Sequence, residues 1–190
     1  MKNTLLAQFL KNPRTTGAVC PSSRSLARML VTGIGIEHAR HVAELGPGTG
    51  AVTGSILGAL PSDSRFFAVE LNPDVIAAFH VNFPEVTVYN DSAANLPSLV
   101  RKEKMDALDA VISGLPWAVF PDPLQEEILA AIVQSLKPGG YFTTFAYVQG
   151  VLLPSGQHFK KRLGRLFPQV EKSPVVWKNF PPAFVYRCRK

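Results

Sequence analysis

The feature that most constrains this chain is a regular alternation of short apolar runs and helical stretches, which begins at residue 41. Such alternation is typical of β-α units, whose strands lie parallel in one sheet with helices on its faces. The length of 190 residues fits one domain of this kind and leaves no room for a second full catalytic domain. With 46% hydrophobic and only 18% charged residues, the chain has the composition of a folded protein.

Five strands, with four helices between them, follow from the pattern along the chain. Asn72-Pro73-Asp74 predicts the start of one helix, and Lys137-Pro138-Gly139-Gly140 predicts the end of another. The expected strands are residues 41–45, 65–71, 86–89, 107–113 and 141–147, and the helices that follow the first four end near residues 60, 83, 104 and 136.

The last part of the chain predicts a change of direction in the sheet. A helix near 157–166 precedes two β-rich runs, 171–178 and 183–189, which are joined by Asn179-Phe180-Pro181-Pro182. A link of four residues is far too short for a parallel crossover, so the two runs are predicted to form an antiparallel hairpin. We therefore expect an α/β fold with a seven-stranded, mostly parallel sheet that ends in an antiparallel hairpin. The hairpin distinguishes this chain from one β-α-β-α-β half of a dinucleotide-binding domain, which has no such hairpin.

A glycine-rich segment, Glu44-Leu45-Gly46-Pro47-Gly48-Thr49-Gly50, comes at the end of the first expected strand. Glycines there let the backbone turn tightly and approach a ligand, and the helix that follows presents free N–H groups to it. As a bare pattern, Gly46, Gly48 and Ala51 also match the G-x-G-x-x-A fingerprint of nicotinamide and flavin proteins. The pattern alone therefore does not identify the ligand, and the surrounding residues must decide whether the segment is such a fingerprint.

An acidic residue is expected at the end of each of the first three strands. Glu44 could bind an ammonium or hold the N–H groups of the glycine-rich loop. Glu70 can accept hydrogen bonds from both ribose hydroxyls of an adenosine. Asp91 can accept one from the adenine amine, while Leu71 offers an apolar surface to the ring. Each acid alone could be a solvated strand end, but the three together favour a nucleoside-binding edge.

The glycine-rich segment and its three acids resemble the class I S-adenosylmethionine-dependent methyltransferases. The resemblance covers about residues 41–190 and implies a Rossmann-like fold with S-adenosylmethionine as the cofactor. It implies cofactor-binding roles for Glu44, Gly46, Gly48, Thr49 and Gly50 near the methionine part, for Glu70 at the ribose, and for Leu71, Asp91 and Ser92 at the adenine.

The fourth strand ends in Ser113-Gly114-Leu115-Pro116-Trp117, where the acceptor would meet the methyl group. Adenine-N6 methyltransferases, including the rRNA adenine dimethylases, have Asn-Leu-Pro-Tyr or a relative at this place, and the Asn holds the target amine. Gly114 stands in the place of that Asn and has no side-chain acceptor, although backbone carbonyls could still receive an amine. The segment could also be a plain turn with Trp117 buried.

Tyr147, at the end of the fifth strand, could hydrogen-bond an amine, and its ring could stabilise a methylated cation. It could equally be a buried core residue. The candidate catalytic residues are Ser113, Leu115, Pro116 and Tyr147. His158 is expected to lie exposed on a surface helix, and we expect no metal site.

The whole chain resembles the soluble bacterial phospholipid N-methyltransferases. The matching segments are Phe9-Leu10-Lys11-Asn12-Pro13, Gly17-Ala18-Val19-Cys20-Pro21-Ser22-Ser23, Ser113-Gly114-Leu115-Pro116 and Trp177-Lys178-Asn179-Phe180-Pro181-Pro182-Ala183. The resemblance implies methylation of the amine of phosphatidylethanolamine or of a related amino lipid such as an ornithine lipid. The alternatives are an RNA methyltransferase with the same cofactor site and a non-catalytic cofactor-binding module.

The net charge of +6 is unevenly distributed. Residues 1–40 carry +5, residues 41–127 carry −8, and residues 128–190 carry +9. The expected division is an N-terminal pair of amphipathic helices over 1–40, forming a membrane or substrate lid, and a methyltransferase domain over 41–190. The second of these helices is expected to start at Pro21-Ser22-Ser23.

The basic regions favour an anionic partner, either nucleic acid or a membrane surface, and charge alone does not choose between them. With the resemblance to the phospholipid N-methyltransferases we expect a membrane surface, and nucleic acid only under the RNA alternative. Lys160, Lys161, Arg162 and Arg165 lie on one expected helix, and the first amphipathic helix either inserts into the membrane or packs on the domain. The candidate residues for the substrate or membrane side are Phe9, Ser22, Ser23, Lys160 and Lys161.

Neither a signal peptide nor a spanning helix is expected from the sequence. Cys20 and Cys188 lack C-x-x-C spacing, which indicates reduced thiols. We therefore expect a cytoplasmic protein that associates peripherally with the inner face of the membrane.

Overall fold

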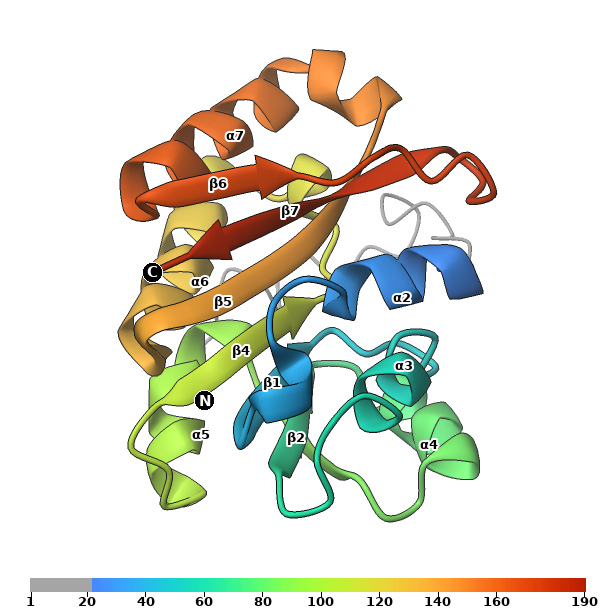
Figure 1. Ribbon diagram of the computed structural model, residues 1–190, viewed down its shortest axis with the longest axis vertical. Coiled ribbons are helices and arrows are strands. Elements are labelled where there is room, and N and C mark those ends of the chain that lie inside the picture. The colour runs from blue at the N-terminus through green and yellow to red at the C-terminus, as the bar shows by residue number, and fades with distance from the viewer. Residues whose placement is uncertain (1–21) are drawn as a thin grey trace.

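The computed structural model describes residues 22–190, and its central element is a seven-stranded sheet in the order β3-β2-β1-β4-β5-β7-β6 (Figure 1). The first five strands pair in parallel, and β7 runs antiparallel to both β5 and β6. This confirms the expected fold class. The strands are β1 (His41–Leu45), β2 (Arg65–Glu70), β3 (Thr87–Asn90), β4 (Leu108–Ser113), β5 (Leu136–Tyr147), β6 (Gln169–Lys172) and β7 (Ala183–Arg189).

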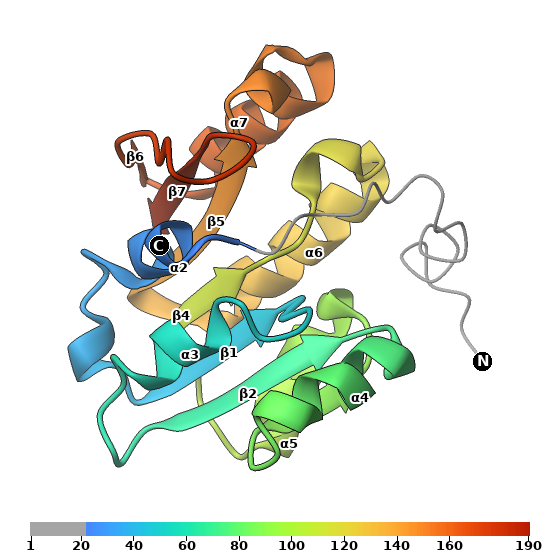
Figure 2. The ribbon, with the colours of Figure 1, turned by 90° about the vertical axis from the view of Figure 1, so that its right-hand side faces the viewer.

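Helices cover both faces of the sheet (Figure 2). Buried residues of α5, α6 and α7 form one core cluster with the sheet, and buried residues of α2 and α3 form a second cluster on the opposite face. The α-helices are α2 (Arg24–Val31), α3 (Thr53–Leu57), α4 (Pro73–Asn82), α5 (Leu96–Lys102), α6 (Asp122–Ser135) and α7 (Pro154–Leu166). The short 3-10 helices are η1 (Ile36–His38), η2 (Ala93–Asn95), η3 (Trp117–Val119) and η4 (Gln149–Leu152).

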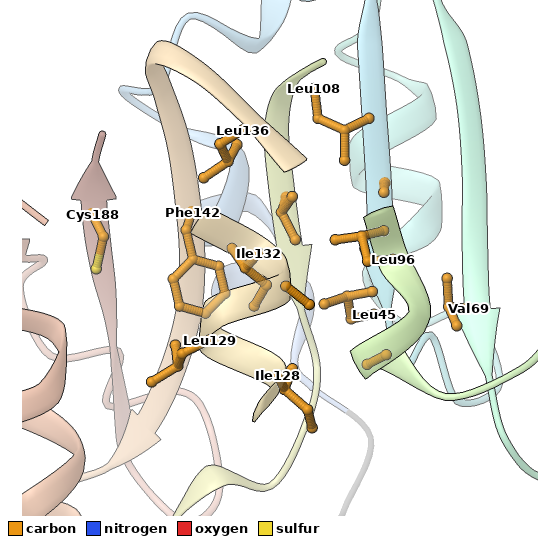
Figure 3. Close-up of a cluster of buried hydrophobic side chains, with 14 of the residues drawn as sticks. Leu45, Val69, Leu96, Leu108, Ile128, Leu129, Ile132, Leu136, Phe142 and Cys188 are labelled. Atoms are coloured by element: carbon orange, nitrogen blue, oxygen red, sulfur yellow. The ribbon is translucent and has the colours of Figure 1, made fainter. Parts of the chain in front are cut away.

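The larger core fills the space between the sheet and the helices α5 and α6 (Figure 3). Leu45 and Leu108 on the strands, Leu96 on α5, and Ile128 and Ile132 on α6 are all fully buried. Burial of each such side chain contributes about 1.5–3 kcal/mol to folding. This core fixes the carboxyl ends of β1, β2 and β4 relative to one another, which is the edge that the sequence marks as functional.

Helix α2 packs on the sheet. Its N-cap is Ser23, whose Oγ accepts a hydrogen bond from the N–H of Leu26 at 3.2 Å. Leu26, Ala27 and Leu30 are at most 1% exposed and belong to the same core cluster as residues of β1 and β7. The first expected amphipathic helix, with Phe9, lies outside the described residues. Within residues 22–190, no helix has the length and apolar character needed to span a membrane.

The connection between the two strands of the hairpin is longer than the sequence pattern predicts. Strand β6 stops at Lys172, and residues 173–182 form a long loop in place of a four-residue link. The cause is local, because Ser173 Oγ accepts the N–H of Val185 at 2.9 Å, in place of the backbone carbonyl oxygen that a regular ladder would use. The prediction of strand structure through residue 178 is therefore wrong, although the antiparallel pairing is confirmed.

Strand β5 starts earlier than expected, at Leu136, and includes the Pro138-Gly139-Gly140 segment that the pattern assigned to a turn. The pairing of β4 with β5 shifts register there, and Gly139 has a positive φ of 76°. The segment is thus an irregular first part of the strand. It lies at the edge of the sheet opposite to the candidate site.

Candidate active site

The glycine-rich loop, residues 46–52, lies where β1, β2 and β4 end. The N–H of Gly46 donates to the carbonyl oxygen of Val69 in β2 at 2.9 Å. The N–H of Gly114, just after β4, donates to the carbonyl oxygen of Leu45 at 2.8 Å. Three strand ends are therefore tied together by backbone hydrogen bonds beneath the loop.

The loop follows a path that requires glycine at position 50. Gly50 has a φ of +91°, and a Cβ there would lie 2.2 Å from Cε2 of Phe83. The helix that was expected directly after the loop is shorter and begins only at Thr53. Residues 48–52 form turns, in which the N–H of Gly50 donates to the carbonyl oxygen of Pro47 at 3.0 Å, and Thr49 is exposed on the loop.

Glu70 ends β2 directly beside this loop. Its Oε1 accepts the N–H groups of Leu71 at 2.9 Å and Asn72 at 3.0 Å. Burial raises the pKa of Glu70, and hydrogen bonds from the backbone of Asn72, Leu71 and Gly48 oppose that rise. The carboxylate is thus held in one orientation at the strand end, as a ribose acceptor needs to be.

Asp91 follows β3 at the next position along the same edge. Its Oδ1 accepts the N–H of Ser92 and the side-chain amide of Asn95, both at 2.7 Å. Ser92 is buried, and its Oγ accepts the N–H of Ala94 at 3.3 Å, which starts η2. Leu71 is half-buried and packs against the larger core. The arrangement presents a carboxylate beside an apolar surface.

Glu44 lies beneath the loop, with only 1% of its surface exposed. The hydroxyl of Thr53 donates to its Oε2 at 2.7 Å. Burial raises the pKa of Glu44 to about 7, and the hydrogen bond from Thr53 partly offsets that rise. Among the described residues the side-chain partner of Glu44 is Thr53, and the loop N–H groups make no hydrogen bond to it.

The segment after β4 is held by Ser113, which is fully buried. Its Oγ accepts the N–H of Leu115 and the indole N–H of Trp117, both at 3.2 Å. Its carbonyl oxygen accepts the hydroxyl of Thr144 from β5, also at 3.2 Å. Ser113 therefore positions the turn that carries Leu115 and Pro116, and it is not among the residues that line the pocket beyond this turn.

Gly114 lies in close contact with the glycine-rich loop. A Cβ at this position would be 2.5 Å from the carbonyl oxygen of Gly46, a backbone atom that cannot move aside alone. The φ of Gly114 is not in the left-handed region, so the restriction is one of space. No residue with a side chain fits at position 114 unless the loop after β1 moves.

A pocket of about 420 Å³ opens directly beyond this turn. It runs between the ends of β4 and β5, helix α7 and the loop before β7, and its walls are mainly aromatic and aliphatic. Trp117 forms part of the wall and stacks on Phe159 of α7, with ring centroids 4.9 Å apart. The lining includes Leu115, Pro116, Trp117, Val119, Phe145, Tyr147, Val151, Phe159, Phe180 and Tyr186.

One pocket is thus lined by three of the candidate catalytic residues, Leu115, Pro116 and Tyr147. The sequence did not indicate Tyr186, which is 1% exposed and lines the same pocket from β7. Its hydroxyl is buried without a hydrogen-bond partner among the described residues, and burial raises its pKa to about 12. The alternation of Phe184, Tyr186 and Cys188 on one face of β7 was the available signal.

The candidate residues for the substrate or membrane side do not form one group. The N–H of Ser23 donates to Oδ1 of Asn179 at 2.9 Å, which joins the start of α2 to the loop before β7. Lys160 and Lys161 are exposed on α7, and His158 is exposed on the same helix as expected. Ser22 is half-buried beside Ser23.

The cofactor-side residues fit S-adenosylmethionine. The loop bends sharply at Gly50, where the methionine part would lie, Glu70 holds an oriented carboxylate that would bind the ribose, and Asp91 lies one strand further along, where it would bind the adenine. A sheet of this order, with an antiparallel β7 and a glycine-rich turn after β1, defines the class I S-adenosylmethionine-dependent methyltransferases.

Comparison with known proteins agrees. The sequence profile of the family described as "Methyltransferase domain" matches residues 42–140, and the chain belongs to this family. The protein is an S-adenosylmethionine-dependent methyltransferase. The matched region contains the glycine-rich loop, all three acids and the Ser113 turn.

A curated relative covers nearly the whole chain. An ornithine lipid N-methyltransferase from Singulisphaera acidiphila is 30% identical in an alignment 189 residues long, which covers 97% of this chain and 93% of the relative. Among solved structures, an O-methyltransferase from Bacillus cereus in complex with SAH has a TM-score of 0.72 and 16% identity, over 100% of this chain and 92% of that one. TomG, an O-methyltransferase from Streptomyces achromogenes in complex with SAM, has a TM-score of 0.66 and 16% identity at the same coverage. These two structures support the fold.

Proposed function

We propose that this protein is an N-methyltransferase that methylates the amine of a membrane amino lipid, either phosphatidylethanolamine or an ornithine lipid, at the inner face of the membrane. The observation that carries the proposal is the apolar pocket at the carboxyl edge of the sheet, beside the cofactor loop. The full-length relationship to an ornithine lipid N-methyltransferase supports the same class of acceptor.

The pocket suits an amine that must lose its proton before it reacts. The lining residues that the structure describes include no charged side chain. An ammonium group that enters such a site loses hydration, and desolvation lowers the pKa of a cationic amine. The pocket therefore favours the free amine, whose lone pair is the nucleophile.

When bound, S-adenosylmethionine supplies a methyl group on a positively charged sulfur. The protein's part is to bind and orient both partners and to exclude water. We assign the orientation of the amine to the hydroxyl of Tyr147, and the stabilisation of the methylated cation to the aromatic faces of Tyr147, Trp117 and Phe159. Ser113 positions the turn that separates the cofactor from the pocket.

The alternative, methylation of an adenine in RNA, has less support from the site. An Asn at position 114 would have to carry the side-chain acceptor, and its Cβ would lie 2.5 Å from the carbonyl oxygen of Gly46. In addition, the lining of the pocket offers no Lys or Arg among the described residues to hold a phosphate.

A labelled-methyl assay tests the proposal. Purified protein with tritiated S-adenosylmethionine is given phosphatidylethanolamine, ornithine lipid or total RNA in separate reactions, and the products are separated by thin-layer chromatography. We expect label in one or both lipids and none in RNA. Label in RNA alone, or in no acceptor despite measurable cofactor binding, would overturn the proposal.

Two matched pairs of variants connect the assay to the site. Glu70→Ala is expected to lose cofactor binding and activity together, whereas Glu85→Ala, an exposed acid away from the edge, is expected to keep both. Tyr147→Phe is expected to lower kcat by about tenfold or more if its hydroxyl orients the amine. Tyr141→Phe, a tyrosine at the far end of the same strand, serves as its control.

A further inference from the structure

Two large aromatic side chains lie in solvent on the loop between β6 and β7, which we call the aromatic loop (residues 173–182). Trp177 is 74% exposed and Phe180 is 83% exposed, whereas the chain's other tryptophan, Trp117, is 2% exposed. Exposed apolar residues are ordinary when scattered, but neighbouring large ones at a functional edge mark an interaction surface.

The loop is anchored, so these side chains are held outward. Asn179, between them, is 3% exposed; its Oδ1 accepts the N–H of Ser23 at 2.9 Å and its Nδ2 donates to the carbonyl oxygen of Pro181 at 2.8 Å. Val176 is buried and forms a β-bridge with Ala183, through an N–H to carbonyl hydrogen bond of 2.7 Å. Buried residues on both sides of Trp177 therefore fix the loop to the domain.

The aromatic loop lies at the same edge as the site. Ala183, where β7 begins, pairs with Tyr147, where β5 ends, so the loop projects from the carboxyl edge of the sheet beside the start of α2 (Figure 1). Phe180 is itself part of the pocket wall. Three further exposed apolar side chains belong to segments that line or adjoin the pocket, namely Val119, Val148 and Leu153.

The charge of the loop and of its immediate neighbour indicates the partner. The aromatic loop carries Lys178 between its two exposed aromatic residues and contains no acid. The start of α2, which Ser23 joins to Asn179 of the loop, adds the exposed Arg24. Trp and Phe next to Lys match the chemistry of an anionic lipid surface, where aromatic rings lie at the headgroup level and basic side chains meet lipid phosphates.

We infer that the aromatic loop docks the enzyme on an anionic lipid bilayer by inserting Trp177 and Phe180, which brings the mouth of the pocket to the membrane surface. The inference rests on the proposed function, because docking is useful to this enzyme only if its acceptor is a lipid that must reach the pocket from the bilayer. It differs from the sequence-based expectation, which assigned docking to the N-terminal helix and to the basic helix that contains Lys160.

The two tryptophans make the test direct. Vesicles of equimolar phosphatidylcholine and phosphatidylglycerol contain no methylatable amine, so binding to them reports docking independently of catalysis. We expect the tryptophan emission of the full chain to shift to shorter wavelength when these vesicles are added. Trp177→Phe, which retains only the buried Trp117, is expected to show no shift while it still sediments with the vesicles.

Removal of the aromatic residues measures their share of the binding. In co-sedimentation, Trp177→Ala and Phe180→Ala are each expected to weaken partitioning by several-fold, and the double variant by about tenfold or more. Val81→Ala is the matched control, because Val81 is 80% exposed on α4 and should not affect binding. Circular dichroism and thermal unfolding confirm that each variant is folded.

Two results would overturn the inference. One is vesicle binding of the full chain without a change in tryptophan emission. The other is a co-sedimentation result in which the full chain does not bind the vesicles, or in which the double variant binds them as strongly as the full chain does. Methyl transfer to detergent-dispersed amino lipid separates this outcome from failure of the proposed function. Trp177→Ala, which is outside the pocket, should keep that activity and lose activity on vesicles.

Discussion

The substitution Glu44→Gln should make the protein more stable at high pH. Burial raises the pKa of Glu44 in the folded state to about 7, from an ordinary value of 4.5. Glutamine has nearly the same shape, retains an oxygen that accepts the hydroxyl of Thr53, and has no charge to bury. The difference between the two pKa values corresponds to about 3 kcal/mol.

The sign follows from proton binding. Between about pH 4.5 and pH 7 the unfolded carboxyl has lost its proton while the folded one retains it, so stability falls as the pH rises. Above pH 7 the cost is complete and constant. The variant lacks this dependence, so its advantage over the parent is expected to grow from none near pH 4.5 to about 3 kcal/mol at pH 8.

Urea unfolding at half-unit steps from pH 4.5 to pH 8.5 measures this difference. Glu85→Gln is the control, because that carboxylate lies in solvent, and its profile should follow that of the parent protein. A constant offset between Glu44→Gln and the parent at all pH values would refute the reasoning, since only a change with pH reports the ionisation of Glu44.

Three further predictions concern single side chains. Gly50→Ala places a Cβ 2.2 Å from Phe83 at a φ of +91°, so we expect the free energy of unfolding to fall by about 1–3 kcal/mol. Calorimetry should also show weaker cofactor binding than for the control variant Gly58→Ala. Tyr186→Phe removes a buried hydroxyl without a described partner, so urea unfolding should show equal or higher stability, by about 1 kcal/mol; a marked loss would mean that the hydroxyl has a partner. Burial raises the pKa of Cys188 to about 12, so in a Cys20→Ser background its thiol should react with iodoacetamide only after unfolding, and rapid labelling of the native protein would contradict this.

Features that depend on local pattern could be predicted from the sequence. The strands around Glu44, Glu70 and Asp91 have clear apolar runs and turn residues at their ends, and in a parallel sheet such ends meet at one edge. The common edge of these three acids followed from that rule. The N-cap at Ser23 is equally local, because it depends on one hydroxyl and a nearby backbone N–H.

Features that depend on distant neighbours could not be predicted. Strand β7 lies between β5 and β6, and only this placement brings Tyr186 into the wall of a pocket that Trp117 and Phe159 complete. The early end of β6 comes from the side chain of Ser173, which takes a hydrogen bond that a longer ladder would need. The alternation along β7 shows which residues share a face but not what that face packs against, and the early end of β6 leaves no periodic signal in the sequence.

The contact between Gly114 and Gly46 also limits how this enzyme could evolve. Every single substitution at position 114 adds at least a Cβ, and that atom meets the backbone of the cofactor loop. A descendant that acquired an Asn there, the residue that adenine-N6 methyltransferases have at this place, would first have to change the glycine-rich loop. The turn after β4 and the loop after β1 would therefore have to change together.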